Sequence, residues 1–511
     1  MKKLLGILVL GLLVCSGSFA EKYPKLKSPI VSISGSTPKK LKVPGKINLA
    51  NYKVNNPRSK IYIDIPKRRK ELKGFDFDND KLNKLCRFKG QFGKILNANK
   101  NQGKNKLIAS MPEMGGFRWK QEGTTPITGT NLAEPMINFT NKLSSHWMVT
   151  GDKIYLEILK EQILLWAKED AFQTLIPDGM AWGYYFGYID TLEYVRQTLA
   201  RMLFAFDILR QGNALTPSED KIIYDWFEKI VAKTSIGPSE GEGKLPPANH
   251  TQASNARIYT MWGVLSGDNE YFQAGLKFYL IALKKTRKDG SSSWEIRKEE
   301  KHSKRSIRGL EKFTQVVGGM VMIAEIFANQ GYDLYSYETK KGVTVHKMIN
   351  FLFTYLGYPE SGAPKKSYID PERQQRKKVI NKTWGDNSLG WAHAYLKRFP
   401  NTDAAKTIIK YYMEPYGWWN KIAQSHGYGI NCACAYADLS KIGTTKTSNQ
   451  IGRYIVVVKN KIDSSILIKT EGPTKEIAEK EAMKTCMGKS TQSSVKDACY
   501  VHYSSKASFG Q

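Results

Sequence analysis

The chain has 511 residues and a formal net charge of +31, because 78 lysines and arginines stand against 47 acidic residues. Its length allows roughly two to four domains, and six cysteines are too few for a fold held together mainly by disulfides. So basic a protein is expected to bind a polyanion, such as an acidic polysaccharide, an anionic membrane surface or a nucleic acid. The alternative is that the excess lysine only keeps the protein soluble.

The first 20 residues have the pattern of a secretory signal peptide. Two lysines precede an apolar run over residues 4–14, and residues 18–20 form a small-x-small cleavage site. The run is too short for a membrane span, and no later run reaches the roughly 18 apolar residues that a span needs. Cys15 would allow a lipoprotein, but the bulky Val14 before it disfavours that cleavage. We therefore expect a periplasmic or secreted protein without a membrane span.

Residues 21–106 show little periodicity, because six prolines and several basic clusters interrupt them. This composition predicts an extended basic arm that wraps a larger domain or is partly disordered. One of its basic clusters, at residues 66–70, fits a solvated tail and equally a segment that binds an anionic chain beside a cleft.

Residues 107–441 are predicted to form a mostly helical domain with almost no strand-like alternation. Apolar residues recur there at helical spacing, which predicts helices over 131–147, 153–168, 191–211, 216–232, 256–265, 270–286, 306–330, 347–356, 384–399 and 402–413. Such a series of paired helices packs as a bundle, a superhelix or a closed ring of hairpins. The sequence has no repeating period that would favour a solenoid.

A small α/β domain is predicted at residues 451–511, after a linker rich in threonine, serine and lysine at 442–450. Its expected elements are strands at 454–458 and 466–469, a helix at 474–487 and a strand at 498–503.

Five cysteines remain after removal of the signal peptide. Cys486 and Cys499 lie in the small C-terminal domain and are the most plausible disulfide pair, closing a short loop. Cys432 and Cys434 form a Cys-x-Cys fragment, which would suit a metal only with a second pair nearby. We therefore favour packed or unpaired thiols for them.

Residues that suit a carboxylate-binding site stand where two predicted helices begin. Asn249 and His250 precede one helix, and Arg305 and Arg308 precede another. An asparagine donates hydrogen bonds, a histidine donates or carries a proton, and an arginine offers a bidentate fork. His302 lies in the basic loop between these helices. The sequence has no metal-ligand spacing and no phosphate-binding glycine loop, so neither a metal nor an organic cofactor is predicted.

Aromatic residues cluster near the ends of several predicted helices, and Tyr184 and Trp391 are among them. Most of this cluster is expected in the core. A side chain at the mouth of a cleft would instead stack on the flat face of a sugar, and Tyr184 and Trp391 are our candidates for that role.

Four motifs occur in a fixed order in the helical domain: an aromatic-rich helix pair at 146–172, Ala248-Asn249-His250, DGSSSWEI at 289–296, and WGDNSLGW at 384–391. Together they resemble the alginate lyase domain, the poly(mannuronate) lyases of polysaccharide lyase family five, over about half of the chain. The family has Asn-Asn-His where this chain has Ala-Asn-His, so the first asparagine is lost.

The resemblance implies an α/α toroid of helical hairpins around a deep groove, and β-elimination on a uronate polymer. The C5 proton of a uronate is barely acidic until its C6 carboxylate is neutralised, which Asn249, His250 and an arginine would achieve. A general base then removes the C5 proton, and an acid protonates the leaving O4. In the family a tyrosine performs this proton transfer.

The chain departs from the family at that tyrosine. The family motif Arg-Ala-Leu-x-Tyr-His-Asn-Tyr falls on residues 308–315, where Arg308 is retained but Phe313 and Gln315 replace the histidine and the catalytic tyrosine. Three explanations are open. Another residue supplies the proton relay, the candidates being Tyr259, Tyr184 and His302; or the substrate differs and the base lies on the other face of the sugar; or the protein binds without cutting.

The sequence thus predicts an exported polysaccharide lyase that cleaves an alginate-like uronate polymer. Asn249, His250, Arg308 and Tyr259 are its expected catalytic residues, and its partner is an acidic polysaccharide, not nucleic acid. The alternative is a non-catalytic periplasmic protein that binds acidic polysaccharide. A third interpretation is a helical envelope protein whose charge is incidental.

Overall fold

The computed structural model describes the N-terminal part of the chain at residues 47–58, 60–72, 86, 118–119, 127–128, 143–149, 151, 153–168 and 170. In the remainder it describes residues 186–235, 249–296, 309–369, 389–416, 428–441, 454–460, 467–472, 475–489 and 499–506.

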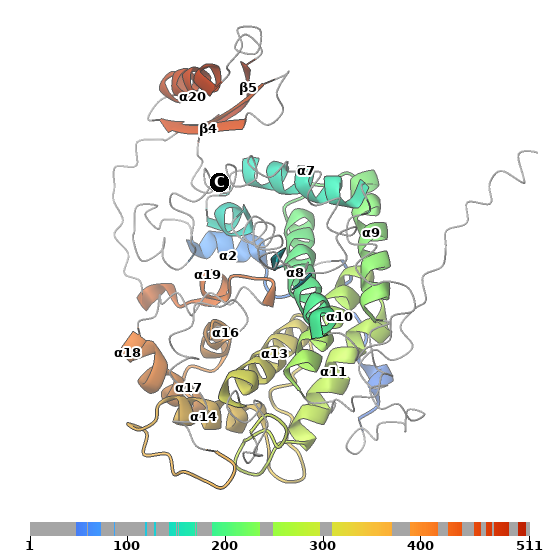
Figure 1. The fold of residues 1–511 in the computed structure, drawn as a ribbon, viewed down its shortest axis with the longest axis vertical. Coiled ribbons are helices and arrows are strands. Elements are labelled where there is room, and N and C mark those ends of the chain that lie inside the picture. The colour runs from blue at the N-terminus through green and yellow to red at the C-terminus, as the bar shows by residue number, and fades with distance from the viewer. Residues whose placement is uncertain are drawn as a thin grey trace, which may run out of the picture.

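Helices form nearly all of the large body of the molecule, as the sequence predicts (Figure 1). They are α7 (Ile154–Lys168), α8 (Phe186–Gln211), α9 (Pro217–Ser235), α10 (His250–Ser266), α11 (Asn269–Lys284), α13 (Gly309–Asn329), α14 (Val345–Leu356), α16 (Trp391–Arg398), α17 (Asp403–Ile408), α18 (Glu414–Tyr416) and α19 (Cys432–Tyr436). Of the first predicted helix, residues 143–149 are helical, and the rest lies outside the described residues.

The helices pack side by side and form the predicted α/α toroid. Helix α10 is the centre of the packing and contacts α8, α11 and α13, while α13 also contacts α14 and α16. One continuous apolar core runs through these helices, with Trp166, Trp226, Trp262 and Trp391 among its largest fully buried side chains. Burial of this area is the main stabilising term of the fold.

The described part of the N-terminal arm, from residue 47 to residue 72, packs against the helical body. Asp207 of α8 accepts hydrogen bonds from the backbone N–H groups of Lys60 and Ile61, each at 2.9 Å. Burial raises the pKa of Asp207 to about 6, against the hydrogen bonds that favour its charged form. This stretch ends in a helix, α2 (Ile65–Leu72), which the sequence analysis missed.

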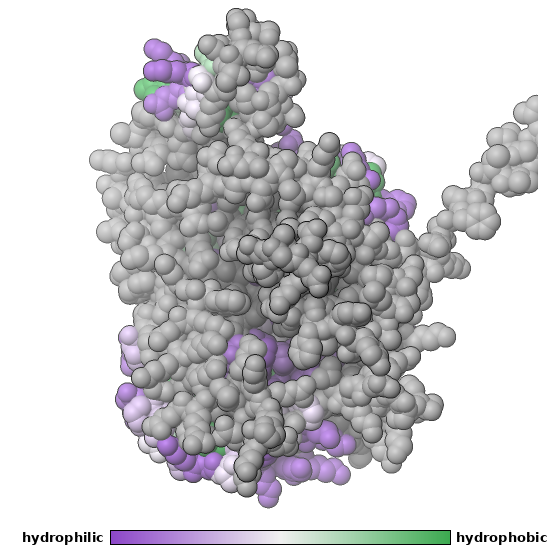
Figure 2. All heavy atoms as spheres, viewed as in Figure 1, coloured by the Kyte–Doolittle hydropathy of each residue, from purple (hydrophilic) through white to green (hydrophobic). Residues whose placement is uncertain are grey.

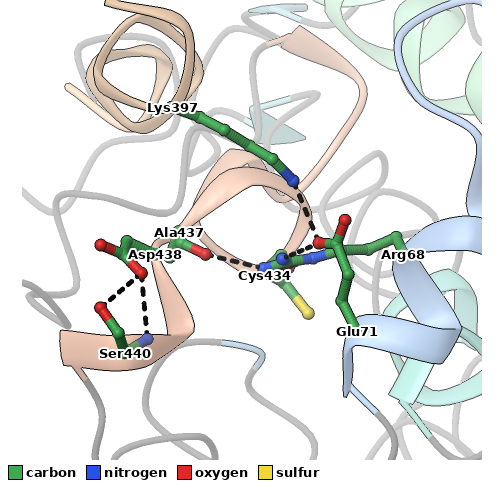
Figure 3. Close-up of polar contacts among 7 residues, drawn as sticks. All are labelled: Arg68, Glu71, Lys397, Cys434, Ala437, Asp438 and Ser440. Carbon is green, nitrogen blue, oxygen red and sulfur yellow. Dashed lines mark hydrogen bonds and ion pairs between the residues drawn. The ribbon is translucent and has the colours of Figure 1, made fainter. Parts of the chain in front are cut away.

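Helix α2 carries part of the basic cluster at residues 66–70, and its Arg68 is a structural residue. Figure 3 shows its guanidinium donating to the carbonyl oxygens of Cys434 and Ala437 and pairing with Glu71, which Lys397 also contacts. Arg68 is only 3% exposed. The prediction that this cluster is a solvated tail or binds a polyanion is therefore wrong for Arg68, since the side chain is already neutralised inside the fold.

Cys434 is bonded to Cys86, across 348 residues of sequence. The prediction that both thiols of the Cys-x-Cys fragment are packed or unpaired is thus wrong for Cys434. Sequence spacing could not reveal a partner so far away, which the packing of α19 alone brings near. Cys432 is buried, with its sulfur 3.9 Å from the sulfur of Met322. Among the described residues no cluster of histidine, cysteine and carboxylate side chains suits a metal ion.

The C-terminal unit is a three-stranded antiparallel sheet covered by one helix. Its elements are β3 (Tyr454–Asn460), β4 (Leu467–Gly472), α20 (Lys475–Lys489) and β5 (Cys499–Lys506), in the order β4-β3-β5. The predicted disulfide between Cys486 and Cys499 is confirmed and joins α20 to β5.

The sheet of this unit has two covered faces. Val456 and Val458 point into a small core beneath α20, whereas Val457 between them joins the main core of the helical body, as expected from side chains that alternate along a strand. Lys459 forms an ion pair with Glu161 of α7, at 3.2 Å. The unit therefore rests on the body at α7, where Figure 1 shows it.

The exposed surface is mostly hydrophilic. On the face shown in Figure 2 the coloured residues are predominantly hydrophilic, and hydrophobic ones are isolated. In the described ranges, no helix has the length and apolarity required to cross a bilayer.

Candidate active site

Helix α10 begins at His250, earlier than the predicted start at residue 256. Asn249 caps it: its backbone is extended, and its side-chain oxygen accepts a hydrogen bond from the N–H of Gln252 at 2.8 Å. The first turns carry few apolar residues, so periodicity alone places the start too late. The Asn249 side chain is as buried as that of Tyr259, at 2% exposure, but it lies at the helix start beside His250. Because the oxygen of its amide is used in the cap, the nitrogen is the end that remains as a donor.

The side chain of His250 is held by Glu295. One carboxylate oxygen, Oε1, accepts the backbone N–H of His250 at 2.8 Å and lies 3.0 Å from the ring nitrogen Nδ1. The Glu295 side chain is 9% exposed and that of His250 is 20% exposed. The carboxylate thus fixes the ring from inside the fold, while part of the ring reaches the surface.

Glu295 is ionised at neutral pH. Its burial alone would raise the pKa, but the positive charge that His250 carries when it is protonated and the two hydrogen bonds from that residue outweigh burial. The positive charge of Lys312 on α13 acts in the same direction, and the pKa of Glu295 lies below its usual value. The stabilisation from this pair is therefore present at neutral pH and is lost as the pH falls through the lowered pKa.

The loop between α11 and α13 positions Glu295. Within it, Arg287 Nη1 donates to three oxygens, those of the Ser291 side chain and of the Ser292 and Ile296 backbone. The Ser292 hydroxyl accepts the backbone N–H of Glu295 at 3.1 Å. These bonds fold the loop into a compact turn, which directs the carboxylate towards the start of α10.

Asp289 ties the same loop to the segment after α14. Its carboxylate accepts hydrogen bonds from Lys366, at 2.7 Å, and from the Tyr368 hydroxyl. Burial raises the pKa of Asp289, but these bonds and those from Ser291 outweigh it and hold the pKa well below its usual range. The loop is thus anchored at both its beginning and its end.

Replacing Gly290 with alanine is expected to displace this loop. Gly290 has φ +93°, and a Cβ there would lie 2.3 Å from the carbonyl oxygen of Lys347. We expect the free energy of unfolding to fall by about 2 kcal/mol more than in Gly362→Ala, measured by chemical denaturation. Gly362 is a matched control, because it has φ +62° but nothing within 4 Å of a Cβ. Equal losses in the two variants would contradict this account of the loop.

Helices α10 and α13 approach closely near the start of α10. A Cβ on Gly319 of α13 would lie 2.9 Å from the Cβ of Ala253 on α10. A Cβ on Gly275 of the neighbouring helix α11 would touch both Thr260 of α10 and Ile323 of α13, so these two residues also lie close together. Ala253 precedes Thr260 in α10, and their neighbours in α13, Gly319 and Ile323, follow in the same order. The two helices run in the same general direction, and their N-terminal ends lie at the same end of the body.

This geometry locates Gln315 relative to the candidate site. It lies one helical turn before Gly319, just as His250 lies about one turn before Ala253. Gln315 is partly exposed, and Lys312 lies a further turn towards the loop that carries Glu295. The residue at the family's tyrosine position is thus at the same end of the α10–α13 pair as His250.

The structure separates the other sequence candidates from this cluster. Tyr259 is 2% exposed and lies nine residues beyond His250, about 13 Å along the helix. Trp391 is fully buried and packs against Phe353, so it cannot stack on a sugar from there. We leave both out of the proposed site. Tyr184, His302, Arg305 and Arg308 lie outside the described residues.

Sequence reasoning missed Glu295 as a site residue. It was quoted only as part of the DGSSSWEI motif, and its separation from His250 by 45 residues gave no sign of contact. The sequence did contain an indication of its role, however. The DGSSSWEI motif resembles the family's Asp-Gly-x-Leu-Pro-x-Glu-Leu, and Glu295 stands at the position of the family's glutamate.

The family model "Alginate lyase" matches residues 105–361, which is half of the chain. The chain therefore belongs to the alginate lyase family, and this membership supports a polysaccharide lyase activity.

Solved structures agree with this fold. A substituted form of alginate lyase A1-III complexed with a tetrasaccharide matches with a TM-score of 0.57 and 19% identity, covering 77% of this chain and 99% of that chain. Alginate lyase A1-III from Sphingomonas species A1 matches with a TM-score of 0.54 and 18% identity, covering 77% and 100%. At this identity the likeness concerns the fold alone. A search of curated proteins gave no match.

Proposed function

We propose that the protein is an exported polysaccharide lyase that cleaves an acidic uronate polymer, alginate-like or polymannuronate-like, by β-elimination. The observation that carries the proposal is the histidine at the mouth of α10, fixed by a buried carboxylate within a chain of the alginate lyase family. The net charge of +31 supports a polyanionic substrate, since a basic surface steers such a polymer towards the protein.

Each chemical need of the elimination has a candidate group. The amide of Asn249 and, by the family resemblance, Arg308 would neutralise the C6 carboxylate, which makes the C5 proton acidic enough to remove. The imidazole of His250 is held at the start of α10 by Glu295, where it can contact a bound polymer. No step requires a metal or an organic cofactor.

Export is part of the proposal. It rests on the signal-peptide pattern of residues 1–20. The two disulfides, Cys86–Cys434 and Cys486–Cys499, support it because such bonds persist in oxidising compartments such as the periplasm.

Gln315 is the observation that favours the second candidate, a binder of acidic polysaccharide without catalysis, because an amide cannot act as a base. Family membership does not favour this alternative. The retained Asn249 and His250 serve either function, since each needs a grip on a carboxylate.

A panel of uronate polymers tests the proposal. We would incubate the mature protein with polymannuronate, polyguluronate and polyglucuronate and follow the ultraviolet absorbance of the unsaturated sugar left by β-elimination. We expect absorbance to rise with at least one polymer. No rise with any of them, together with binding that weakens as salt is added, would replace the lyase with the binder.

Gln315→Tyr is expected to increase turnover of polymannuronate, because it places a phenolic hydroxyl at the family's tyrosine position, at the same end of the α10–α13 pair as His250. A gain of about ten-fold is reasonable for one added proton-transfer group, measured by the same absorbance assay. Gln315→Phe is the matched control, with the ring but not the hydroxyl. An equal gain in both variants, or none in the tyrosine variant, would exclude Gln315 from the reacting centre.

A further inference from the structure

We propose that His250, through its Nε2 atom, is the general base that replaces the family's tyrosine, and that Glu295 is the positioning residue that holds the ring in the required form. The proposal rests on the proposed lyase function and assigns the role that Gln315 cannot fill.

The first argument is the tautomer of the ring. An ionised carboxylate has no proton to donate, so Glu295 Oε1 can only accept hydrogen bonds. The Nδ1 atom of His250, 3.0 Å away, must then carry a proton. In the neutral imidazole this leaves the lone pair on Nε2, which is the nitrogen that can take a proton from a substrate.

The second argument is orientation. Oε1 also accepts the backbone N–H of His250, at 2.8 Å, so the same oxygen holds the main chain and the ring. The Glu295 side chain is more buried than that of His250. The loop bonds of Arg287 and the Ser292 hydroxyl in turn fix the glutamate. A base fixed in this way needs little reorganisation when the substrate binds.

The third argument concerns the neighbouring charges. Glu295 approaches from the loop after α11, and Lys312 acts on it from the first turns of α13. Lys312 partly balances the buried carboxylate and stands on the helix that also carries Gln315.

The proposed step is balanced as follows. The Nε2 lone pair takes the C5 proton, the C5–H electron pair forms the C4=C5 double bond, and the C4–O4 bond breaks with its pair on O4. O4 takes a proton from water, and the imidazolium later returns its proton to the solvent. In this step Asn249 neutralises the carboxylate, so His250 is free to act as the base.

Glu295→Gln tests the proposal in the full-length mature protein. Glutamine keeps an oxygen that accepts the same bonds but has no charge, so we expect kcat to fall about 100-fold with KM changed less than about three-fold. Glu295→Asp, which keeps the charge, should recover part of the loss. Glu325→Gln is the matched control: Glu325 is also buried and is bound by Arg398 and Tyr335, and its variant should keep kcat within about two-fold.

A spectroscopic readout of the native protein does not depend on any variant at Glu295 folding. Histidine-labelled nitrogen NMR, with His250→Ala to assign the signal, should find His250 protonated on Nδ1 in its neutral form. Protonation on Nε2 instead would overturn the proposal. So would a Glu295→Gln variant with native kcat, while the lyase function would stand. A native protein inactive on every polymer would overturn the lyase function and the proposal together.

Discussion

His250→Ala is expected to lower turnover of the preferred uronate polymer by about a thousand-fold, the largest effect on activity that we predict. The variant removes the ring that Glu295 orients and leaves no other described histidine at the start of α10. The measurement is the initial rate of absorbance increase at saturating polymer.

The matched control for this loss is His502→Ala. His502 lies on β5 of the C-terminal unit and is largely exposed, so its variant should keep the native rate. Binding of the polymer by His250→Ala should persist, because Asn249 and the basic surface are unchanged. A His250→Ala variant that keeps more than about a tenth of the native rate would exclude His250 as the base.

Removing the Cys86–Cys434 bond is expected to have the largest effect on stability. It joins segments 348 residues apart, and both sulfurs lie inside the fold. Loss of a native disulfide typically costs about 2–5 kcal/mol, and the chain-entropy model places so long a loop at the upper end of that range or above it. We expect the Cys86→Ser/Cys434→Ser double variant to unfold at a temperature lower by several degrees in thermal denaturation followed by circular dichroism.

Two comparisons isolate this bond. The Cys486→Ser/Cys499→Ser variant opens only a short loop within the C-terminal unit, so the helical body should melt at the native temperature. A reducing agent added to the native protein should reproduce the loss seen in the Cys86→Ser/Cys434→Ser variant. A body that melts unchanged without the Cys86–Cys434 bond would show that Arg68 and the packing of α19 suffice to hold these segments together.

The helices were largely predictable from sequence because their signal is local. Apolar residues at helical spacing placed α7, α11 and α14 within about two residues of their ends, the usual uncertainty of helix boundaries, and ended α9 too early. The start of α10 was placed too late, because its first turns are polar and their helicity depends on the Asn249 cap. Local pattern also gave the strands of the C-terminal unit and its disulfide.

Features that depend on long-range contact were not predictable from the residues alone. Arg68 stands in a run of basic residues that looks solvated, yet it is buried and donates to the carbonyl oxygens of Cys434 and Ala437, more than 360 residues away. The partner of Cys434 is equally remote. The pairing of Glu295 with His250 follows from a loop folding back on α10, and no spacing rule describes such a fold. In each case burial, not local sequence, decides the role of the side chain.

The most direct test of the central claim is the chemistry of the released products. We would digest the preferred polymer with the mature protein in heavy-oxygen water and analyse the oligosaccharides by mass spectrometry. β-Elimination predicts products that carry an unsaturated terminal uronate and no heavy oxygen at the cleaved bond. Saturated products that have taken up heavy oxygen would mean hydrolysis, and would contradict the assignment of this protein as a lyase.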